Sequence, residues 1–313
     1  MTDPVDKHLE RVFKRLDGSS LGTSDAGFSD ADLALGPLGE RNDLLFGFYT
    51  AEGLIKALRA YGTLGKLKRR VGQLTLTLEL DDPFLPRLLA YPVDGSRDAP
   101  VIDLSLSLRT GGGLGIEEAA DARLLYLESI VLQRPAEPFT WDRPPLPYQS
   151  FPGLNLSGEI LQLLVLMARR LGTEGLALTP KSATSAAIFS RFFRFLDPKA
   201  ATRMRAFRHA MRAYPFWYVA WAAEQGCLRD AAGEAMSFTP ALMLVPLTER
   251  MRELLPAGSS RALPTRALAA LSPGPPAFTV DDACMRSRFP WGKMPRQPPP
   301  PEVVALVGER PGR

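Results

Sequence analysis

A single carboxylate inside an apolar stretch is the first residue that could carry chemistry. Glu128 interrupts residues 124–132, which are otherwise almost continuously apolar and typical of a strand that is covered on both faces. Burial disfavours the charged form of a carboxylate, so such a residue can act as a general base. The alternative is a structural role, because a charge in a buried strand is usually paired, here with one of the many arginines. We take Glu128 as the candidate catalytic residue and keep the paired role open.

A short glycine-containing turn could bind an anion. Residues 152–161 read Pro-Gly-Leu-Asn-Leu-Ser-Gly-Glu-Ile-Leu and lead into an apolar stretch whose length favours a buried helix. The first backbone N–H groups of a helix lack an intrahelical partner, and the helix dipole adds partial positive charge there. The residues that would face the anion are two glycines that keep the backbone accessible, an asparagine that tolerates left-handed geometry and a serine that can donate: Gly153, Gly158, Asn155 and Ser157. The alternative is an ordinary helix N-cap supplied by the same asparagine or serine.

A run of basic residues marks a third candidate site. Residues 191–212 contain seven basic residues and one acid, and helical spacing puts Arg205, Arg208 and Arg212 on one face. This face is either simply solvated or a site for a protein or another acidic partner. No recognisable nucleic-acid-binding module accompanies it, so we do not expect a nucleic acid as partner.

Composition excludes several classes of protein. The 313 residues include 38 basic and 34 acidic ones, a balance that does not indicate nucleic acid or an anionic membrane as a partner. Two cysteines (Cys227 and Cys284) and two histidines (His8 and His209) are too few for a disulfide framework or for a zinc site, so we expect no metal. No apolar run reaches the ~18 residues of a transmembrane helix, and the start lacks the pattern of a secretory signal. We therefore expect a cytoplasmic protein without a membrane segment.

Hydrophobic periodicity predicts the elements that precede the turn. Apolar residues recur at helical spacing in residues 3–16 and 42–61. Leucines alternate with polar residues in residues 73–80 and 102–109, which predicts two strands that are each solvated on one face. Such faces suit neighbouring antiparallel strands. We interpret residues 81–100, which contain several prolines, as the connection between them.

The elements after the turn are shorter. The pattern predicts a buried strand at residues 176–180, a helix at 182–192 and a strand at 193–198. Residues 199–226 are helical in pattern and rich in aromatic side chains, which we expect in the core. Residues 238–247 could form a further strand that two prolines weaken.

The order strand, turn, helix, strand, helix, strand over residues 124–198 resembles the core of the GNAT superfamily of N-acetyltransferases. Besides the turn, the resemblance is carried by Ala168-Arg-Arg-Leu-Gly172, Leu176–Thr179 and Ala186-Ala-Ile-Phe-Ser-Arg-Phe-Phe-Arg-Phe195. It implies a helix N-terminus that holds the pyrophosphate of acetyl-CoA or another acyl-CoA, with Gly153, Asn155, Ser157 and Gly158 at the cofactor.

The chain also departs from the family's pattern. In the signature Q/R-x-x-G-x-G/A, the leading position falls on Pro152 and the two small positions fall on Asn155 and Ser157. The family often uses a tyrosine to protonate the departing thiolate, and the matching residue here is Phe189, which has no proton to donate. The resemblance therefore implies either an active acyltransferase with Glu128 as its base or a relative with eroded chemistry.

These observations predict an α/β fold with a GNAT-like mixed, mostly antiparallel sheet flanked by helices, an N-terminal helical extension and a Pro-rich C-terminal tail. We expect an N-terminal helix and flexible polar segment in residues 1–40, the α/β domain in 41–255, and an extended or disordered tail in 256–313. The expected function is acyl-CoA-dependent N-acyl transfer. The alternative is a non-catalytic interaction or regulatory protein of the same fold that binds an acidic partner through the basic helix face.

Overall fold

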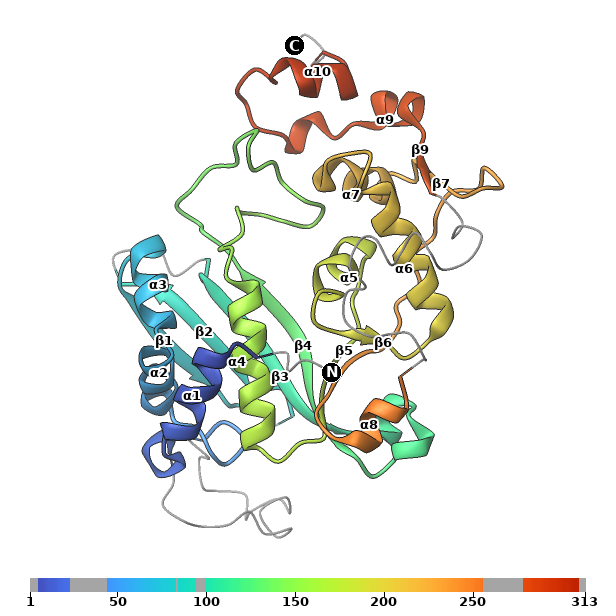
Figure 1. The fold of residues 1–313 in the computed structure, drawn as a ribbon. Coiled ribbons are helices and arrows are strands. Elements are labelled where there is room, and N and C mark those ends of the chain that lie inside the picture. Colours follow the sequence, from blue (N-terminus) through green and yellow to red (C-terminus); the bar gives the residue numbers. More distant parts are fainter. Residues whose placement is uncertain (1–4, 23–43, 83, 94–98, 256–277, 310–313) are drawn as a thin grey trace.

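A sheet of seven strands forms the centre of the protein (Figure 1). The computed structural model describes residues 5–22, 44–82, 84–93, 99–255 and 278–309. The strand order is β1-β2-β3-β4-β5-β8-β6, and every neighbouring pair is antiparallel except β4 and β5, which are parallel. The strands are β1 (Leu74–Glu79), β2 (Arg87–Pro92), β3 (Ile102–Thr110), β4 (Arg123–Leu132), β5 (Gly175–Leu178), β6 (Arg194–Phe195) and β8 (Met243–Pro246). The expected α/β class, with a mostly antiparallel sheet flanked by helices, is confirmed.

One face of the sheet is covered by helices from the first half of the chain. Helix α4 (Ser157–Arg170) connects the parallel strands β4 and β5 and lies across the sheet, as Figure 1 shows. Most of its apolar residues are buried, in a core that also contains leucines of β3 and β4. Helices α1 (Lys7–Arg15), α2 (Ala51–Ala60) and α3 (Thr63–Val71) complete this layer. Helix α1, which was expected in an N-terminal extension, thus belongs to this layer, and its Leu9 is buried in the main core.

The second half of the chain adds a helical group beside the short strands. It contains α5 (Ala183–Phe189), α6 (Pro198–Ala210) and α7 (Phe216–Glu224), and their buried residues belong to the same hydrophobic core as α4 and the sheet. Helix α8 (Glu249–Glu253) packs against a smaller apolar cluster that includes Leu124 of β4. The aromatic residues expected in the core are partly there, since Tyr218 is fully buried and Trp221 is 7 % exposed.

Strand β2 corrects the predicted arrangement of the first strands. Residues 81–100 were interpreted as a connection, but β2 lies in this stretch and separates β1 from β3. The sequence of β2 does not alternate between apolar and polar residues. Its consecutive residues Leu88, Leu89 and Ala90 point to opposite faces of the sheet, and all three are buried. A strand covered on both faces shows no period of two.

The C-terminal stretch also differs from its prediction as an extended tail. Between residues 278 and 309 the chain forms β9 (Thr279–Val280), α9 (Asp282–Arg288) and α10 (Pro301–Val307), and β9 pairs with β7 (Leu228–Arg229). Apolar side chains of this stretch are buried in the main core. The proline run at residues 298–301 leads into a helix, because Pro300 is the N-cap and Pro301 the first residue of α10. Residues 256–277 lie outside the described residues, as do residues 23–40 of the polar segment that was expected within residues 1–40.

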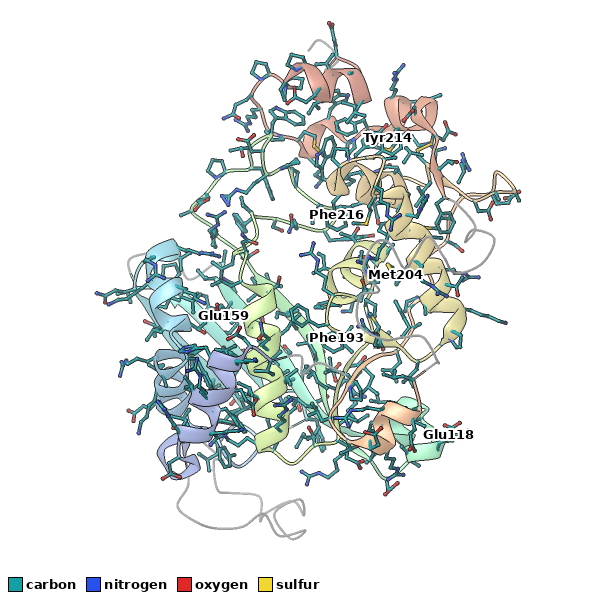
Figure 2. The ribbon with its side chains drawn as sticks, viewed as in Figure 1. Glu118, Glu159, Phe193, Met204, Tyr214 and Phe216 are labelled. Carbon is teal, nitrogen blue, oxygen red and sulfur yellow. A yellow bond between two sulfur atoms is a disulfide. The ribbon has the colours of Figure 1, made fainter. Side chains whose placement is uncertain are left out.

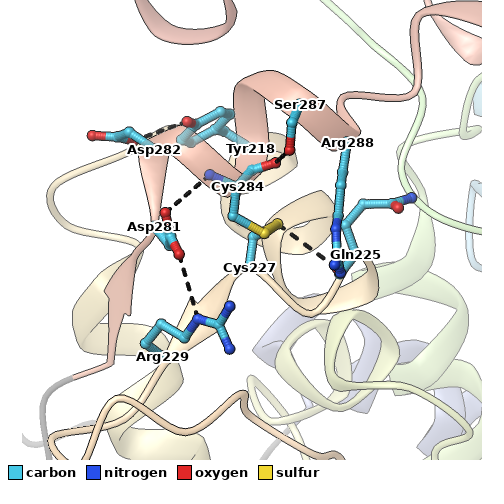
Figure 3. Close-up of a disulfide and its surroundings, with 9 residues drawn as sticks. All are labelled: Tyr218, Gln225, Cys227, Arg229, Asp281, Asp282, Cys284, Ser287 and Arg288. Atoms are coloured by element: carbon cyan, nitrogen blue, oxygen red, sulfur yellow. Dashed lines mark hydrogen bonds and ion pairs between the residues drawn. A yellow bond between two sulfur atoms is a disulfide. The ribbon is translucent and has the colours of Figure 1, made fainter.

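A disulfide between Cys227 and Cys284 attaches α9 to the end of α7 (Figure 3). The two Cα atoms are 5.5 Å apart, and the bond joins residues 57 positions apart in sequence. Asp281 caps α9 by accepting a hydrogen bond from the Cys284 amide at 2.9 Å, and it forms an ion pair with Arg229 at 3.5 Å. The prediction that two cysteines are too few for a disulfide framework therefore missed this single cross-link.

Candidate functional site

The parallel strands β4 and β5 stop pairing before β4 reaches the start of α4. Their pairing ends at Tyr126 and Ala177, while β4 continues to Leu132. The chain then returns beside the end of β4, where the Leu154 amide donates a hydrogen bond to the Leu132 carbonyl at 3.0 Å. The first turn of α4 therefore lies at the end of β4, beyond the point at which β5 stops pairing with it.

The turn before α4 leaves helix amides available. Asn155 has a left-handed backbone with φ of 56°, and the side chains of Asn155 and Ser157 are exposed. The residue at the N-cap position is Leu156, and no side chain caps the helix, so the alternative of an N-cap from Asn155 or Ser157 is not observed. Among the described residues, no group accepts a hydrogen bond from the amide of Ser157 or Gly158. Two donors at a positive helix end can bind an anion.

Helix α3 supplies basic side chains to the same turn, which the sequence did not predict. The Arg70 guanidinium donates to the Asn155 carbonyl at 2.9 Å and also to the Leu154 carbonyl. Lys66 forms an ion pair with Glu159, which lies on the side of α4 that faces α3 (Figure 2). The signal for this contact is the basic run of residues 66–70, but its meaning depends on α3, which was not predicted.

Two other side chains affect what could bind at the turn, one by its charge and one by its size. The Glu159 carboxylate places a negative charge in the first turn of α4, where it also accepts a hydrogen bond from Thr63. On the other side, the ring of Phe192 lies 3.4 Å from the point that a Cβ on Gly158 would occupy. The absence of a side chain at position 158 therefore lets this ring pack against the helix tip.

Glu128 lies on a β-bulge of β4. Ser129 and Leu127 of β4 lie opposite two consecutive residues of β3, so Glu128 between them is an extra residue. Its carboxylate accepts a hydrogen bond from the Ser107 hydroxyl at 2.6 Å and another from Arg109 Nε at 3.0 Å. The Glu128 side chain is 21 % exposed, and Arg109 is its ion-pair partner. The structure thus has the arginine pairing that the sequence left open.

Glu128 and the turn lie on the same half of β4 but do not meet. Ser107 and Arg109 alternate with the leucines of β3 that pack in the core, so Glu128 projects from the face opposite α4. Leu132 at the turn lies four positions after Glu128, which is about 13 Å of extended strand. The two predicted parts of an active site are therefore near each other along the strand and on different faces of it.

Two cavities among the described residues lie elsewhere, and neither is lined by the turn or by Glu128. The smaller one, of about 130 Å³, lies between the start of α6 and residues 236–241, with Lys199 and Arg203 in its wall. The larger one, of about 400 Å³, lies between α2, α3 and the first strands. No group of three or more His, Cys, Asp or Glu side chains in the described ranges is arranged to hold a metal ion.

The basic residues of α6 lie on its exposed side, as predicted. Arg205 and Arg208 are exposed, and Arg212 is exposed in the turn that follows the helix. Met204 and Phe207 of the same helix are buried, and Figure 2 labels Met204. Arg205 donates to the Thr202 hydroxyl at 3.0 Å. Within the part of the chain that the structure describes, none of these three arginines has an acidic side chain within ion-pair distance.

No described helix is both long and apolar enough to cross a membrane. The chain was also compared with models of protein families and with curated proteins, and neither comparison found a match.

Proposed function

We propose that the chain is a GNAT-like protein that binds acyl-CoA and transfers its acyl group to an amine. The observation that carries this proposal is the pair of unbonded amides at Ser157 and Gly158, which lie at the end of β4 beyond the part that pairs with β5. The order of elements gives support, because a parallel strand pair connected by a helix is the arrangement that the sequence resemblance implies. The left-handed backbone at Asn155 allows the chain to turn there without a glycine.

Several groups would take part in binding and transfer. The amides of the α4 tip would hold the pyrophosphate, with the Arg70 and Lys66 side chains close enough to add positive charge. Bound acyl-CoA supplies the thioester. Glu128 would accept the proton of the attacking amine as the C–N bond forms and the C–S bond breaks, and the thiolate would take a proton from water. For this the Glu128 carboxylate has to exchange at least one of its present partners, Ser107 or Arg109. The thioester and the amine also have to reach the face of β4 opposite α4, because the carboxylate lies on that face.

Specific observations favour a second candidate function, a non-catalytic protein that binds an acidic partner. Glu128 is neutralised by Arg109, and Phe189, at the position of the expected acid, packs against Phe193 with 6.0 Å between ring centroids. The arginines of α6 are exposed and have no acidic partner in the described residues. A surface of this kind attracts acidic peptides through long-range charge.

Calorimetric titration of acetyl-CoA and of CoA separates the two functions. Under the first proposal both ligands bind in the micromolar range, which corresponds to about 8 kcal/mol. Ser157→Glu should weaken binding by at least tenfold, because a carboxylate at the helix tip repels phosphate although it favours the helix itself. Ser157→Gln, which has the same size without the charge, should bind like the wild type. Absence of binding to the wild-type protein would overturn the acyltransferase proposal.

The second function is tested with a fluorescent polyglutamate peptide. Arg205→Glu combined with Arg208→Glu should reduce its affinity by at least tenfold. Arg11→Glu combined with Lys14→Glu on α1 makes the same change of charge at two exposed residues elsewhere, and it should leave most of the affinity in place. Equal losses in both double variants would reduce the effect to net charge and overturn a site on α6.

A further inference from the structure

The larger of the two cavities described above is an apolar groove beside the edge of the sheet. It has a volume of about 400 Å³, which falls within the range of small-molecule sites. Helices α2 and α3 form one wall with Ile55, Leu58 and Leu64, and β1 forms the other with Leu74 and Leu76. All five side chains are half-buried, so solvent reaches part of each of them.

Positive charge accompanies this apolar surface. Arg59 and Lys68 are the charged residues among those that line the groove, and both are exposed. No acidic residue lines the groove, and no ion pair of Arg59 or Lys68 is found within the described ranges. An apolar body of suitable size with an anionic end would therefore match the groove both in polarity and in charge.

Gly65 keeps one part of the wall open. It lies within α3, and a Cβ added there would meet only the end of the Arg69 side chain, at 3.7 Å. Alanine and leucine are better helix formers than glycine, so a larger residue at position 65 would suit the helix. A side chain at this position would extend from the wall of the groove.

We propose that this groove binds a single-chain carboxylate amphiphile, such as a fatty acid. The alkyl chain lies between α3 and β1, and the carboxylate lies at the end of the groove near Arg59 and Lys68. The site is separate from the proposed acyl-CoA site, because neither the turn at 153–158 nor Glu128 lines it. Its occupancy therefore does not depend on acyltransferase activity.

The test is calorimetric titration of the full chain with octanoate, decanoate and dodecanoate below their micellar concentrations. We expect binding of one molecule per chain, with affinity that rises about fourfold per methylene, equivalent to about 0.8 kcal/mol, until the groove is full. Decyltrimethylammonium has an alkyl chain of nearly the same length as that of decanoate but a positively charged head group. It should bind at least tenfold more weakly than decanoate. Equal binding of decanoate and the cation would overturn the proposal.

Variants locate the ligand. Gly65→Leu should reduce decanoate affinity at least tenfold, whereas Gly65→Ala should change it by less than threefold. Lys68→Glu should also lower the decanoate affinity tenfold. The control is Lys56→Glu, which should not lower it, because Lys56 is an exposed residue of α2 that does not line the groove. The Lys68 pair decides the matter if Gly65→Leu does not fold.

Two results would contradict the assignment. Wild-type affinity in a folded Gly65→Leu variant, or in Lys68→Glu, would overturn it. Size-exclusion chromatography provides the other check: a wild-type dimer that Gly65→Leu converts to a monomer would show that a second copy of the chain occupies the groove instead.

Discussion

The backbone of Asn155 determines how the chain enters α4. A φ of 56° is unfavourable for most L-residues, and asparagine and glycine accept it more readily than the others. Its side chain is exposed, so a change there acts mainly through the backbone. We expect Asn155→Val to lower the free energy of unfolding by about 1–2 kcal/mol and Asn155→Gly to change it by less than about 0.5 kcal/mol. Urea denaturation of the two variants measures this, and equal stability would contradict a strained turn.

The pairing of Glu128 with Arg109 can be measured as a coupling energy. Both residues also contact Ser107, and the Arg109 guanidinium lies 5.1 Å from the centre of the Tyr126 ring. We expect a double-mutant cycle of Glu128→Gln and Arg109→Met to give about 1 kcal/mol of coupling, because methionine retains the apolar contact and removes the charge.

A matched cycle on Glu249 and Arg252 serves as the control. This pair is exposed and lies three residues apart on α8, so its coupling should be no more than about 0.5 kcal/mol. Additive effects at Glu128 and Arg109 would indicate that the partly buried carboxylate finds another partner, and its paired role would then have to be abandoned.

At the scale of elements, the sequence predicts those whose two faces differ. The leucines at 74, 76 and 78 alternate with polar residues, and β1 forms there; β3 follows from the same pattern. Strand β2 has buried residues on both faces and gives no such signal. The pattern predicts no helix between residues 61 and 73, but α3 begins directly after Gly62, whose φ is 78°, and continues through Gly65, a residue type that weakens helices.

The candidate site was also predictable only in part. The turn at Asn155 and the helix after it follow from local sequence, which also gives the glycines and the serine. The contacts of Arg70 do not follow from local sequence, because they depend on the position of α3. The partners of Glu128 do not follow from it either, because they depend on a bulge that shifts the register of β4 against β3. Such long-range pairing is decided by packing of the whole sheet.

Helix α9 allows a prediction of pH dependence at the scale of one element. Its N-cap, Asp281, accepts a hydrogen bond from the Cys284 amide, and this bond, with the nearby Arg229 charge, lowers the pKa of Asp281 below its ordinary value of 3.8. A carboxylate with a lowered pKa stabilises the folded state above its unfolded pKa, and this contribution is lost as pH falls through the folded value. Asn also caps helices but carries no charge.

We therefore expect Asp281→Asn to melt below the wild type at every pH between 5 and 8, by a constant difference. The difference in melting temperature should narrow once the pH falls below about 3.8, because Asp281 then takes up a proton in the unfolded wild-type chain. Thermal melting across this range measures it. Asp281→Ala should melt lower still, since it also loses the cap, and a difference that stays constant down to pH 2 would contradict the ionic contribution.

At the scale of the whole molecule, the C-terminal stretch is linked to the candidate site through the loop at residues 133–156. The Trp221 indole of α7 donates to the Pro145 carbonyl at 2.8 Å, and the Trp141 indole donates to the Gln297 carbonyl at 3.0 Å. Trp141 and Trp291 also contact edge to face, with 6.5 Å between ring centroids. This loop leads directly into the turn before α4, so the position of the turn depends on how firmly residues 278–309 are held.

The Cys227–Cys284 disulfide is the covalent part of that attachment, and its removal tests the dependence. We expect Cys227→Ala combined with Cys284→Ala to lower the free energy of unfolding by about 2–4 kcal/mol, because the unfolded chain is no longer closed into a loop. Hydrogen exchange should become faster in residues 278–309 and, to a smaller degree, in 133–156. Dithiothreitol should reproduce these changes in the wild type and leave the double variant unaltered; equal effects on both would exclude the disulfide as their cause.

The same bond bears on the expected cytoplasmic location, which stays a prediction. Disulfides persist in oxidising compartments and are rare in the cytosol, where thiols are kept reduced. Alkylation of intact cells with a maleimide reagent, followed by mass analysis, measures the state of both cysteines. Labelled cysteines would agree with a cytoplasmic protein that folds without the cross-link at the lower stability of the double variant. Unlabelled, bonded cysteines would indicate an oxidising compartment, because a buried Cys227 bonded to Cys284 has no free thiol to react.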